Sequence, residues 1–478
     1  MSTDSYKAIM DQKAEIMRSS VGINYEKYTT GVLSFDYEAM LNDTGYDLDA
    51  TRDIQGRSAV GDTPLVELKN LTELVRAVSE PGKGARLFVK DEAANPSGSF
   101  KDRRASLSAF EAKKKGYKGI AAATSGNYGA AVASQAAKAG LGCIIVQEAF
   151  DSKKIAQPEI AEKTRACEAY GAEVVRLSVG PELFYYFLII LKETGYFNAS
   201  LYTPYSILGI ETLGYELAMQ VKAREGRFPD VVVATHAGGG NVTGTTRGLI
   251  KAGAADTLMV AASVDLSGLH MASDRDFNRK SFTTGHTGFS VPFSTWPDRV
   301  DVPRNAARSL RYMDRFVTVT QGEVFYMTEA LAVIEGMERG PAGNTSLAAA
   351  FAIAREMDRE QIIIVQETEY TGAGKHPLGQ LNLAKQMGID VRRGDPRENQ
   401  PGKAIVIPEH PSQIKPVEMD LDRIRRSYLR NALDSLPEGE KATEKDLEFL
   451  AADTKSTQDY VRDVVNELIR TRFLGGKV

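Results

Sequence analysis

The chain has 478 residues, of which 42% are hydrophobic, and a formal net charge of −4 at pH 7. The hydrophobic fraction is ordinary for a globular protein with a large core, and the length is enough for roughly two to four domains. The slightly acidic balance, with a pI of about 5.9, argues against nucleic acid or an anionic membrane as the main partner.

Further features predict a soluble protein of the cytoplasm. Residues 1–20 carry scattered charges and no apolar centre, which is not typical of a signal peptide. The longest apolar run, residues 183–191, is too short to cross a bilayer. The two cysteines, Cys143 and Cys167, do not form a disulfide framework, which favours a reducing compartment, and we expect both in the core.

After a polar, largely helical arm at residues 1–60, short β-branched runs alternate with longer helical stretches. The runs lie at residues 144–146, 174–175, 231–233, 259–260, 316–319 and 362–365. Continuous apolar strands separated by helices indicate parallel sheets that are covered on both faces. The sequence therefore predicts an α/β fold.

A turn between a strand and a helix carries Lys101. Strand-like residues 87–90 precede the segment Asn-Pro-Ser-Gly-Ser-Phe-Lys-Asp-Arg-Arg at 95–104, and an alanine-rich helical stretch follows. Pro96 and Gly98 break the chain, and a serine hydroxyl can cap the new helix. A cation at the positive end of a helix dipole is disfavoured, so the pKa of the amine falls, as a nucleophile requires. A solvated lysine in a first helical turn explains the segment equally well.

A second turn contains Asn127. The sequence Thr-Ser-Gly-Asn-Tyr-Gly at 124–129 follows the apolar residues 119–123 and precedes a helix expected to begin near Ala130. The flanking glycines let the backbone approach a flat ligand, and the amide can donate to a ring oxygen. A helix-capping turn is the alternative, and it is favoured when this segment is taken alone.

A third turn, Gly-Gly-Gly-Asn-Val-Thr-Gly at 238–244, directly follows the strand at 231–235. A glycine-rich turn that opens a helix presents N–H groups to an anion, most often a phosphate. A dinucleotide fingerprint needs glycine where Thr243 stands, and Lys375 is followed by His376, so a Walker loop is excluded too. The pattern predicts one phosphate and no dinucleotide, with a plain tight turn as the alternative.

Other polar residues accompany these turns. Thr371 follows the strand at 362–365, on the edge where α/β sheets bind ligands, and can bond to a ring nitrogen unless the segment is an ordinary loop. His236, just before the glycines, either polarises a substrate carbonyl or caps the strand, and the structural role is favoured. His286 lies in a glycine-rich loop of lid-like composition. No cluster has the spacing of metal ligands.

The end of the chain differs in composition. Five prolines between residues 394 and 416 predict a linker that runs over the surface, followed by charged helices. The last helix has an apolar face that we expect to pack on the body of the protein, although a partner subunit could also cover it. That face consists of Tyr460, Val461, Val464, Val465, Leu468 and Ile469.

The order of these motifs resembles the fold-type II pyridoxal-phosphate enzymes, and threonine synthase in particular, over residues 60–390. The resemblance implies that pyridoxal 5′-phosphate is the cofactor and that Lys101 binds it covalently. It also implies that Asn127 contacts the 3-hydroxyl and that Thr371 partners the pyridine nitrogen. The cofactor phosphate would lie on the glycine turn, at Gly238, Gly239, Gly240, Asn241 and Val242.

The resemblance further implies a tryptophan synthase β-like fold with two parallel-sheet domains and helical extensions at both ends. The expected division is an arm at 1–60, a large cofactor-binding domain at 61–100 and 206–393, a small domain with the asparagine turn at 101–205, and a linker with a C-terminal helical extension at 394–478. The chain departs from ordinary threonine synthases at both ends and at Gly-Asn-Thr, residues 343–345, where a serine- and alanine-rich run is usual.

The stretch at 21–28 (Val-Gly-Ile-Asn-Tyr-Glu-Lys-Tyr) and the whole-chain pattern are most similar to the β subunits of 2-amino-4-oxopentanoate (2-amino-4-ketopentanoate) thiolases of ornithine degradation. That family uses CoA to cleave its substrate into acetyl-CoA and alanine. The resemblance implies a small α subunit as partner and a homodimeric β core. A basic group could contact CoA phosphates, although a solvated helix face is favoured. It comprises Lys113, Lys114, Lys115 and Lys118.

The expected chemistry uses Lys101, once freed, as the base that moves the Cα proton. CoA brings its own sulfur, so no catalytic cysteine is required. The alternatives are a threonine synthase acting on O-phosphohomoserine, a β-eliminating ammonia-lyase, and a non-catalytic scaffold subunit of the same fold. A scaffold needs neither Lys101, nor Asn127, nor the glycine turn, so an intact set favours an enzyme.

Overall fold

The computed structural model describes residues 3–124, 126–151, 154–180, 182–266, 279–284, 301–370 and 376–475. Thr371 and His286 lie outside the described residues, so the roles predicted for them stay predictions. Within the described ranges, no helix is both long enough and apolar enough to cross a membrane.

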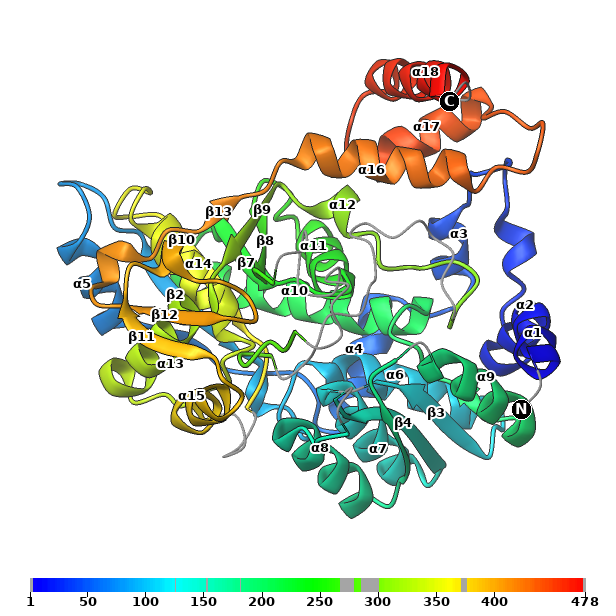
Figure 1. The fold of residues 1–478 in the computed structure, drawn as a ribbon, viewed down its shortest axis with the longest axis horizontal. Coiled ribbons are helices and arrows are strands. Elements are labelled where there is room, and N and C mark those ends of the chain that lie inside the picture. Colours follow the sequence, from blue (N-terminus) through cyan, green and yellow to red (C-terminus); the bar gives the residue numbers. More distant parts are fainter. Residues whose placement is uncertain are drawn as a thin grey trace.

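A seven-stranded sheet forms the larger half of the molecule (Figure 1). Its strands are, in spatial order, β1 (Leu65–Glu67), β2 (Arg86–Asp91), β10 (Ile362–Glu367), β7 (Val231–Thr235), β8 (Leu258–Val264), β9 (Arg315–Val319) and β13 (Val417–Glu418). The five inner strands are parallel, and the two edge strands pair antiparallel. Its covering helices are α5 (Lys69–Ala77), α10 (Pro204–Glu225), α11 (Gly240–Lys251), α13 (Gln321–Glu335) and α14 (Asn344–Ala354). The short helix α12 (Ser309–Tyr312) contacts α11, and α15 (Pro377–Gln386) contacts α13.

A four-stranded, wholly parallel sheet forms the smaller half. Its strands are β5 (Glu173–Ser178), β4 (Gly142–Phe150), β3 (Gly119–Ala123) and β6 (Phe197–Asn198), and its helices are α6 (Lys101–Lys114), α7 (Asn127–Ala139), α8 (Pro158–Ala169) and α9 (Glu182–Thr194). These strands lie inside the range 101–205 predicted for the small domain. The division of the chain into domains nevertheless stays a prediction.

Alternating burial explains why the strands of the larger sheet read as continuous apolar runs. In β10, Ile362 and Ile364 enter a core shared with α10 and α11, whereas Ile363 and Val365 enter a core shared with α13 and α14. Each face of the sheet therefore has its own layer of helices, as a parallel sheet requires. All six predicted runs lie in strands, and the α/β prediction is confirmed.

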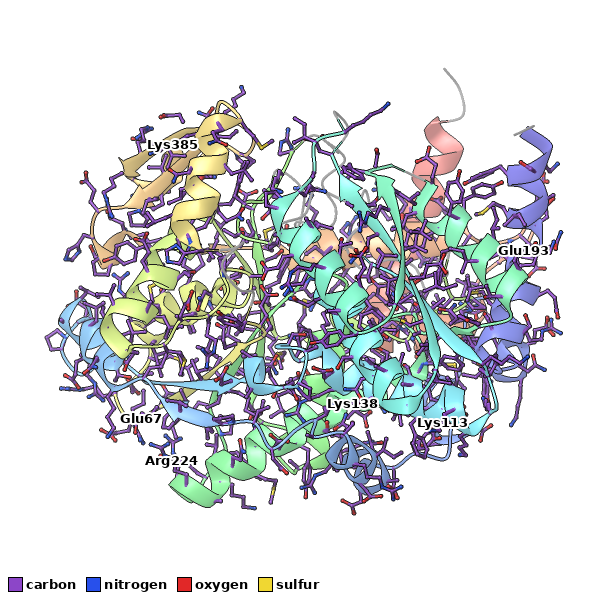
Figure 2. All side chains as sticks on the ribbon, turned by 90° about the horizontal axis from the view of Figure 1, so that it is seen from below. Glu67, Lys113, Lys138, Glu193, Arg224 and Lys385 are labelled. Carbon is purple, nitrogen blue, oxygen red and sulfur yellow. The ribbon has the colours of Figure 1, made fainter. Side chains whose placement is uncertain are left out.

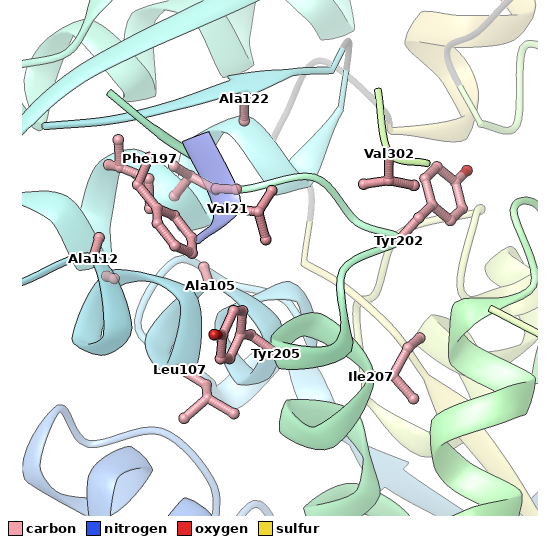
Figure 3. Close-up of a cluster of buried hydrophobic side chains, with 14 of the residues drawn as sticks. Val21, Ala105, Leu107, Ala112, Ala122, Phe197, Tyr202, Tyr205, Ile207 and Val302 are labelled. Atoms are coloured by element: carbon pink, nitrogen blue, oxygen red, sulfur yellow. The ribbon is translucent and has the colours of Figure 1, made fainter. Parts of the chain in front are cut away.

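The N-terminal arm is helical, as predicted, and its first two helices pack on the smaller half. It contains α1 (Thr3–Asp11), α2 (Lys13–Val21), the 3₁₀ turn η1 (Tyr25–Tyr28), α3 (Tyr37–Asn42) and α4 (Leu48–Arg57). Figure 1 shows α1 and α2 beside α9. Val21 lies in the buried cluster of Figure 3 with Phe197 and Ala105, so the arm contributes to the core.

The proline-rich segment is more ordered than a linker over the surface. Residues 404–408 form β12 (Ala404–Pro408), which pairs in parallel with β11 (Asp390–Gly394), and its apolar side chains are buried against α13 and α15. Pro396 and Pro411 begin the 3₁₀ turns η5 (Pro396–Glu398) and η6 (Pro411–Gln413). Two of the prolines thus begin turns, but a third, Pro408, is the last residue of a five-residue strand.

Three C-terminal helices follow: α16 (Leu421–Asp434), α17 (Glu444–Asp453) and α18 (Gln458–Gly475). The apolar face predicted for α18 packs on this chain, because Val461, Val464 and Val465 are buried in the core that also contains α10 and α11. Asp446 of α17 accepts hydrogen bonds from the backbone N–H groups of Leu33 and Ser34, at 2.9 and 2.8 Å. The two extensions of the chain therefore meet.

Candidate active site

The turn that carries Lys101 is fixed to the end of β10. Lys101 is the first residue of α6, and Gly98 has a φ of +80°, which favours glycine. The N–H of Phe100 donates to the carbonyl of Thr368 (3.0 Å), and the N–H of Tyr370 donates to the carbonyl of Gly98 (2.8 Å). The predicted strand–turn–helix is thus present, and it places Lys101 at the carboxyl edge of neighbouring parallel strands.

The surroundings of Lys101 favour a neutral amine. Burial of the amine lowers its pKa well below the ordinary value, the nearby charge of Arg104 lowers the pKa further, and Glu369 opposes both. The amine nitrogen lies 4.5 Å from the ring centre of Phe100. Lys101 is therefore not a freely solvated lysine. Burial is the main cause of the lowered pKa, whereas the sequence pointed to the helix dipole.

The glycine turn forms a closed cradle. Gly239 has a φ of +86°, and α11 begins at the next residue. A Cβ on Gly238 would overlap the hydroxyl of Tyr202. A Cβ on Gly239 would lie 2.7 Å from the hydroxyl oxygen of Ser309. A side chain from another element thus lies directly against each of these two glycines. A glycine-rich turn that opens a helix can bind an anion through its N–H groups.

Arg104 forms another wall of this cradle and was not singled out from the sequence. Its guanidinium Nη2 lies where a Cβ of Gly240 would stand. The residue is 3% exposed, and among the described residues its Nε and Nη2 have no hydrogen-bond partner. Burial lowers the pKa of Arg104 to about 10, which leaves it charged at neutral pH. The signal in the sequence was the second arginine of the pair that follows Lys101.

Close packing of α10 between α6 and α11 fixes the distance from Lys101 to the glycine turn. A Cβ on Gly209 of α10 would overlap the carbonyl of Arg103 in α6, and a Cβ on Gly214 would overlap the carbonyl of Thr245 in α11. A Cβ on Gly248 of α11 would likewise overlap the carbonyl of Glu211. Helix backbones in direct contact cannot slide, so Arg104 is held against the turn.

Asn127 is the first residue of α7, three residues earlier than the helix start expected from the sequence. Its Oδ1 is buried, and the described residues provide no hydrogen-bond partner for it. Gly129 does not face a ligand: a Cβ there would lie 3.0 Å from Ile145 and 3.1 Å from Thr124. A 3.0 Å hydrogen bond from Gln135 to Asp102 joins α7 to α6, the helix that carries Lys101.

His236, Cys143 and Cys167 have structural surroundings. Nε2 of His236 lies 3.1 Å from the hydroxyl of Ser309, which backs the glycine turn. Burial lowers the pKa of His236 to about 3, so the imidazole is neutral. Burial also raises the pKa of each cysteine thiol to about 12, and both lie in the core as predicted. In the described parts of the chain, no group of His, Cys, Asp and Glu side chains could hold a metal ion.

The basic group at the end of α6 and just beyond it mostly serves to hold neighbouring segments. Lys113 donates to the carbonyl of Ala139 (2.7 Å), and Figure 2 shows it at the same outer edge as Lys138. Lys115 donates to the hydroxyl of Tyr205 (3.0 Å). Lys114 reaches the hydroxyl of Tyr46 (3.2 Å), whereas Lys118 is exposed. These contacts support the structural interpretation of the group over a CoA site.

Glu367, at the end of β10, is a second buried residue that the sequence did not reveal. Its carboxylate packs where a Cβ of Gly343 would stand, at the start of α14. Neither oxygen accepts a hydrogen bond of normal geometry from the described residues. Burial raises its pKa well above 4.5; Glu369 and Asp91 add to this, while the backbone N–H of Glu369 and the charge of Arg339 oppose it. The raised pKa of Glu367 favours the protonated form of its carboxyl group.

Glu367→Gln is expected to make stability less dependent on pH. A raised pKa means that the native state keeps a proton that the unfolded chain releases. The unfolding free energy of the wild type therefore falls as the pH rises above the pKa that this glutamate has in the unfolded chain. Glutamine does not titrate, so the stability of the variant should increase relative to that of the wild type between about pH 5 and pH 8. Urea unfolding across that range measures the difference, with the exposed Glu360→Gln as control. Parallel pH curves for wild type and Glu367→Gln would contradict a raised pKa of Glu367.

Comparisons with known proteins agree with this geometry. Residues 57–367 match a family model described as pyridoxal-phosphate dependent enzyme. A 2-amino-4-ketopentanoate thiolase beta subunit from an unknown prokaryotic organism is 66% identical, over 97% of this chain and 98% of that protein. A protein of the same name from Acetoanaerobium sticklandii is 61% identical, over 98% of this chain and all (100%) of that protein.

More distant relatives share less of the chain. A threonine synthase from Bacillus sp. is 32% identical over 40% of this chain and 49% of that protein. Among solved structures, a threonine deaminase from T.th. superposes with a TM-score of 0.51 and 25% identity, covering 67% of this chain and 97% of that one. The resemblance inferred from the motifs is therefore confirmed.

Proposed function

The chain belongs to the pyridoxal-phosphate dependent enzyme family, and from this premise we propose that it cleaves 2-amino-4-oxopentanoate with CoA to give acetyl-CoA and alanine. It would thus be an acyltransferase of ornithine degradation. The observation that carries the proposal is the near full-length similarity to two thiolase beta subunits, extensions included. A threonine synthase activity is less well supported, because a threonine synthase that is 32% identical matches 40% of this chain, and one that matches 60% of it is 27% identical.

The residues of the site fit pyridoxal 5′-phosphate, the cofactor of the family. The glycine turn and the unpartnered donors of Arg104 surround a cradle that suits a phosphate. We propose that Gly238, Gly239, Gly240, Asn241 and Val242 hold that phosphate. Asn127, whose Oδ1 has no described partner, would contact the 3-hydroxyl through its amide, and Thr371 would partner the pyridine nitrogen.

When bound, the cofactor supplies an electron sink for bonds at the substrate Cα. The chain then positions one amine and excludes water around it. Burial and Arg104 lower the pKa of Lys101, which favours the neutral amine, so its Nζ can take the Cα proton and later return it. Neither Cys143 nor Cys167 can act as a nucleophile, since burial keeps both thiols protonated. The sulfur is therefore that of CoA.

We further propose that the chain works with a small α subunit around a homodimeric β core in the cytoplasm, since its relatives are named beta subunits. The positioned Lys101, whose amine has a lowered pKa, weighs against a scaffold subunit without activity. Lys101 and the glycine turn are held by contacts within this chain, so we expect cofactor binding without the α subunit.

The test is a visible-absorbance titration of the purified chain with 2-amino-4-oxopentanoate and, separately, with O-phosphohomoserine. A saturable spectral change with the ketone, followed by acetyl-CoA formation when CoA and the α subunit are added, is the expected result. A response to O-phosphohomoserine alone would overturn the proposal in favour of threonine synthase.

A further inference from the structure

Arg104 is a buried cation whose Nε and Nη2 donors meet no acceptor among the described residues. Its neighbour Arg103 is also buried but donates to Glu92 at 2.7 Å and to Glu216 at 3.1 Å. Arg247 likewise has Glu211 at 2.5 Å. A buried charge is costly unless it is paired, so an arginine with free donors in the interior indicates that a ligand supplies the counter-charge.

The position of Arg104 identifies the kind of ligand. Its guanidinium contacts Gly240, the first residue of the twelve-residue helix α11, and the first N–H groups of a helix have no partner within the helix. An anion there would meet both the helix N-terminus and a guanidinium. Arg104 also follows Lys101 by three residues, so both side chains lie on one face of α6. One small molecule can therefore reach the amine at one end and the guanidinium at the other.

We propose that Arg104 binds the cofactor phosphate, adding a charged side chain to a glycine turn that otherwise offers only backbone N–H groups. This proposal deepens the proposed function and rests on it for the identity of the cofactor. Arg104 is a positioning residue: it holds the phosphate end, and Lys101 on the same helix holds the reactive end. The competing ligand is the substrate carboxylate, which the test below separates from the phosphate.

The test compares Arg104→Met with wild type in binding to the cofactor-free full-length chain. We expect the variant to bind pyridoxal 5′-phosphate roughly 10- to 100-fold more weakly, as for a lost charge-assisted hydrogen bond. Binding of pyridoxal, which lacks the phosphate, should change less than about twofold, because no charge-assisted bond is lost. Arg104→Lys should recover part of the loss. Lys113→Met, at the far end of α6, is the matched control and should bind both compounds as wild type does.

Thermal unfolding without cofactor separates this role from a structural one. Because Nε and Nη2 have no partner in the described chain, the cofactor-free Arg104→Met variant should unfold at the wild-type temperature or above it. Equal affinity of wild type and variant for pyridoxal 5′-phosphate, or an equal loss for pyridoxal, would overturn the proposal. A raised KM for the substrate with unchanged cofactor affinity would assign Arg104 to the carboxylate instead. The binding measurement needs neither substrate nor α subunit. The role of Arg104 can therefore be tested even if the thiolase proposal fails.

Discussion

Lys101→Ala is expected to abolish turnover and to remove the visible absorbance band of the bound cofactor. The side chain supplies both the covalent attachment and the base that moves the Cα proton. Loss of a positioned base alone lowers kcat by about 10²- to 10⁴-fold. Absorbance spectra of the variant loaded with pyridoxal 5′-phosphate, together with acetyl-CoA formation, measure the two effects separately.

Two further variants make this result specific to Lys101. Lys101→Arg keeps a positive charge but provides no amine of low pKa, so it should lose as much activity as the alanine variant. Lys113→Ala removes an exposed lysine from the same helix and should leave the spectrum unchanged. An intact visible band in Lys101→Ala would place the attachment at another lysine and remove Lys101 from the site.

The local patterns predicted the fold because each depends on neighbouring residues. The run at 362–365 is apolar at every position because alternate residues face two different cores, which is a property of a covered parallel strand. The turns before Lys101 and at Gly239 could be predicted in the same way, because glycine is favoured where φ is positive. Periodicity and turn chemistry are encoded within a few residues, and a single sequence displays them directly.

What the sequence did not show depends on contacts between distant segments. Arg104 is significant because its Nη2 lies against Gly240 without a described partner, and Glu367 because its carboxyl group is buried against Gly343. Neither fact has a local signature: an arginine in a helix and a glutamate after a strand are usually solvated. The strand β12 was missed for a similar reason, because its partner β11 and the helices beneath it decide its structure.

Arg103→Met is expected to destabilise the protein by about 3 to 5 kcal/mol, the cost of breaking a buried ion pair on one side. Arg103 is fully buried and pairs with Glu92 and Glu216, while Lys90 also contacts Glu216. Methionine fills much of the volume but leaves two buried carboxylates with one cation. Urea unfolding measures the loss. Arg57→Met, which breaks only an exposed pair with Asp53, should cost less than about 1 kcal/mol.

The pH dependence of the same variant tests the cause. Burial alone would raise the pKa of Glu216, but Arg103 and Lys90 lower it to about 2. A carboxyl group whose pKa is lower in the native state stabilises the fold at any pH above its pKa in the unfolded chain. This contribution is lost as the pH falls toward the native pKa. Wild type should therefore lose stability between about pH 4.5 and pH 2, and Arg103→Met should lose less over that range. A double-mutant cycle with Glu216→Gln should show coupling, because the second substitution removes a charge that the first left unpaired. Additive losses would mean that Arg103 stabilises α6, and with it Lys101, through packing and not through charge.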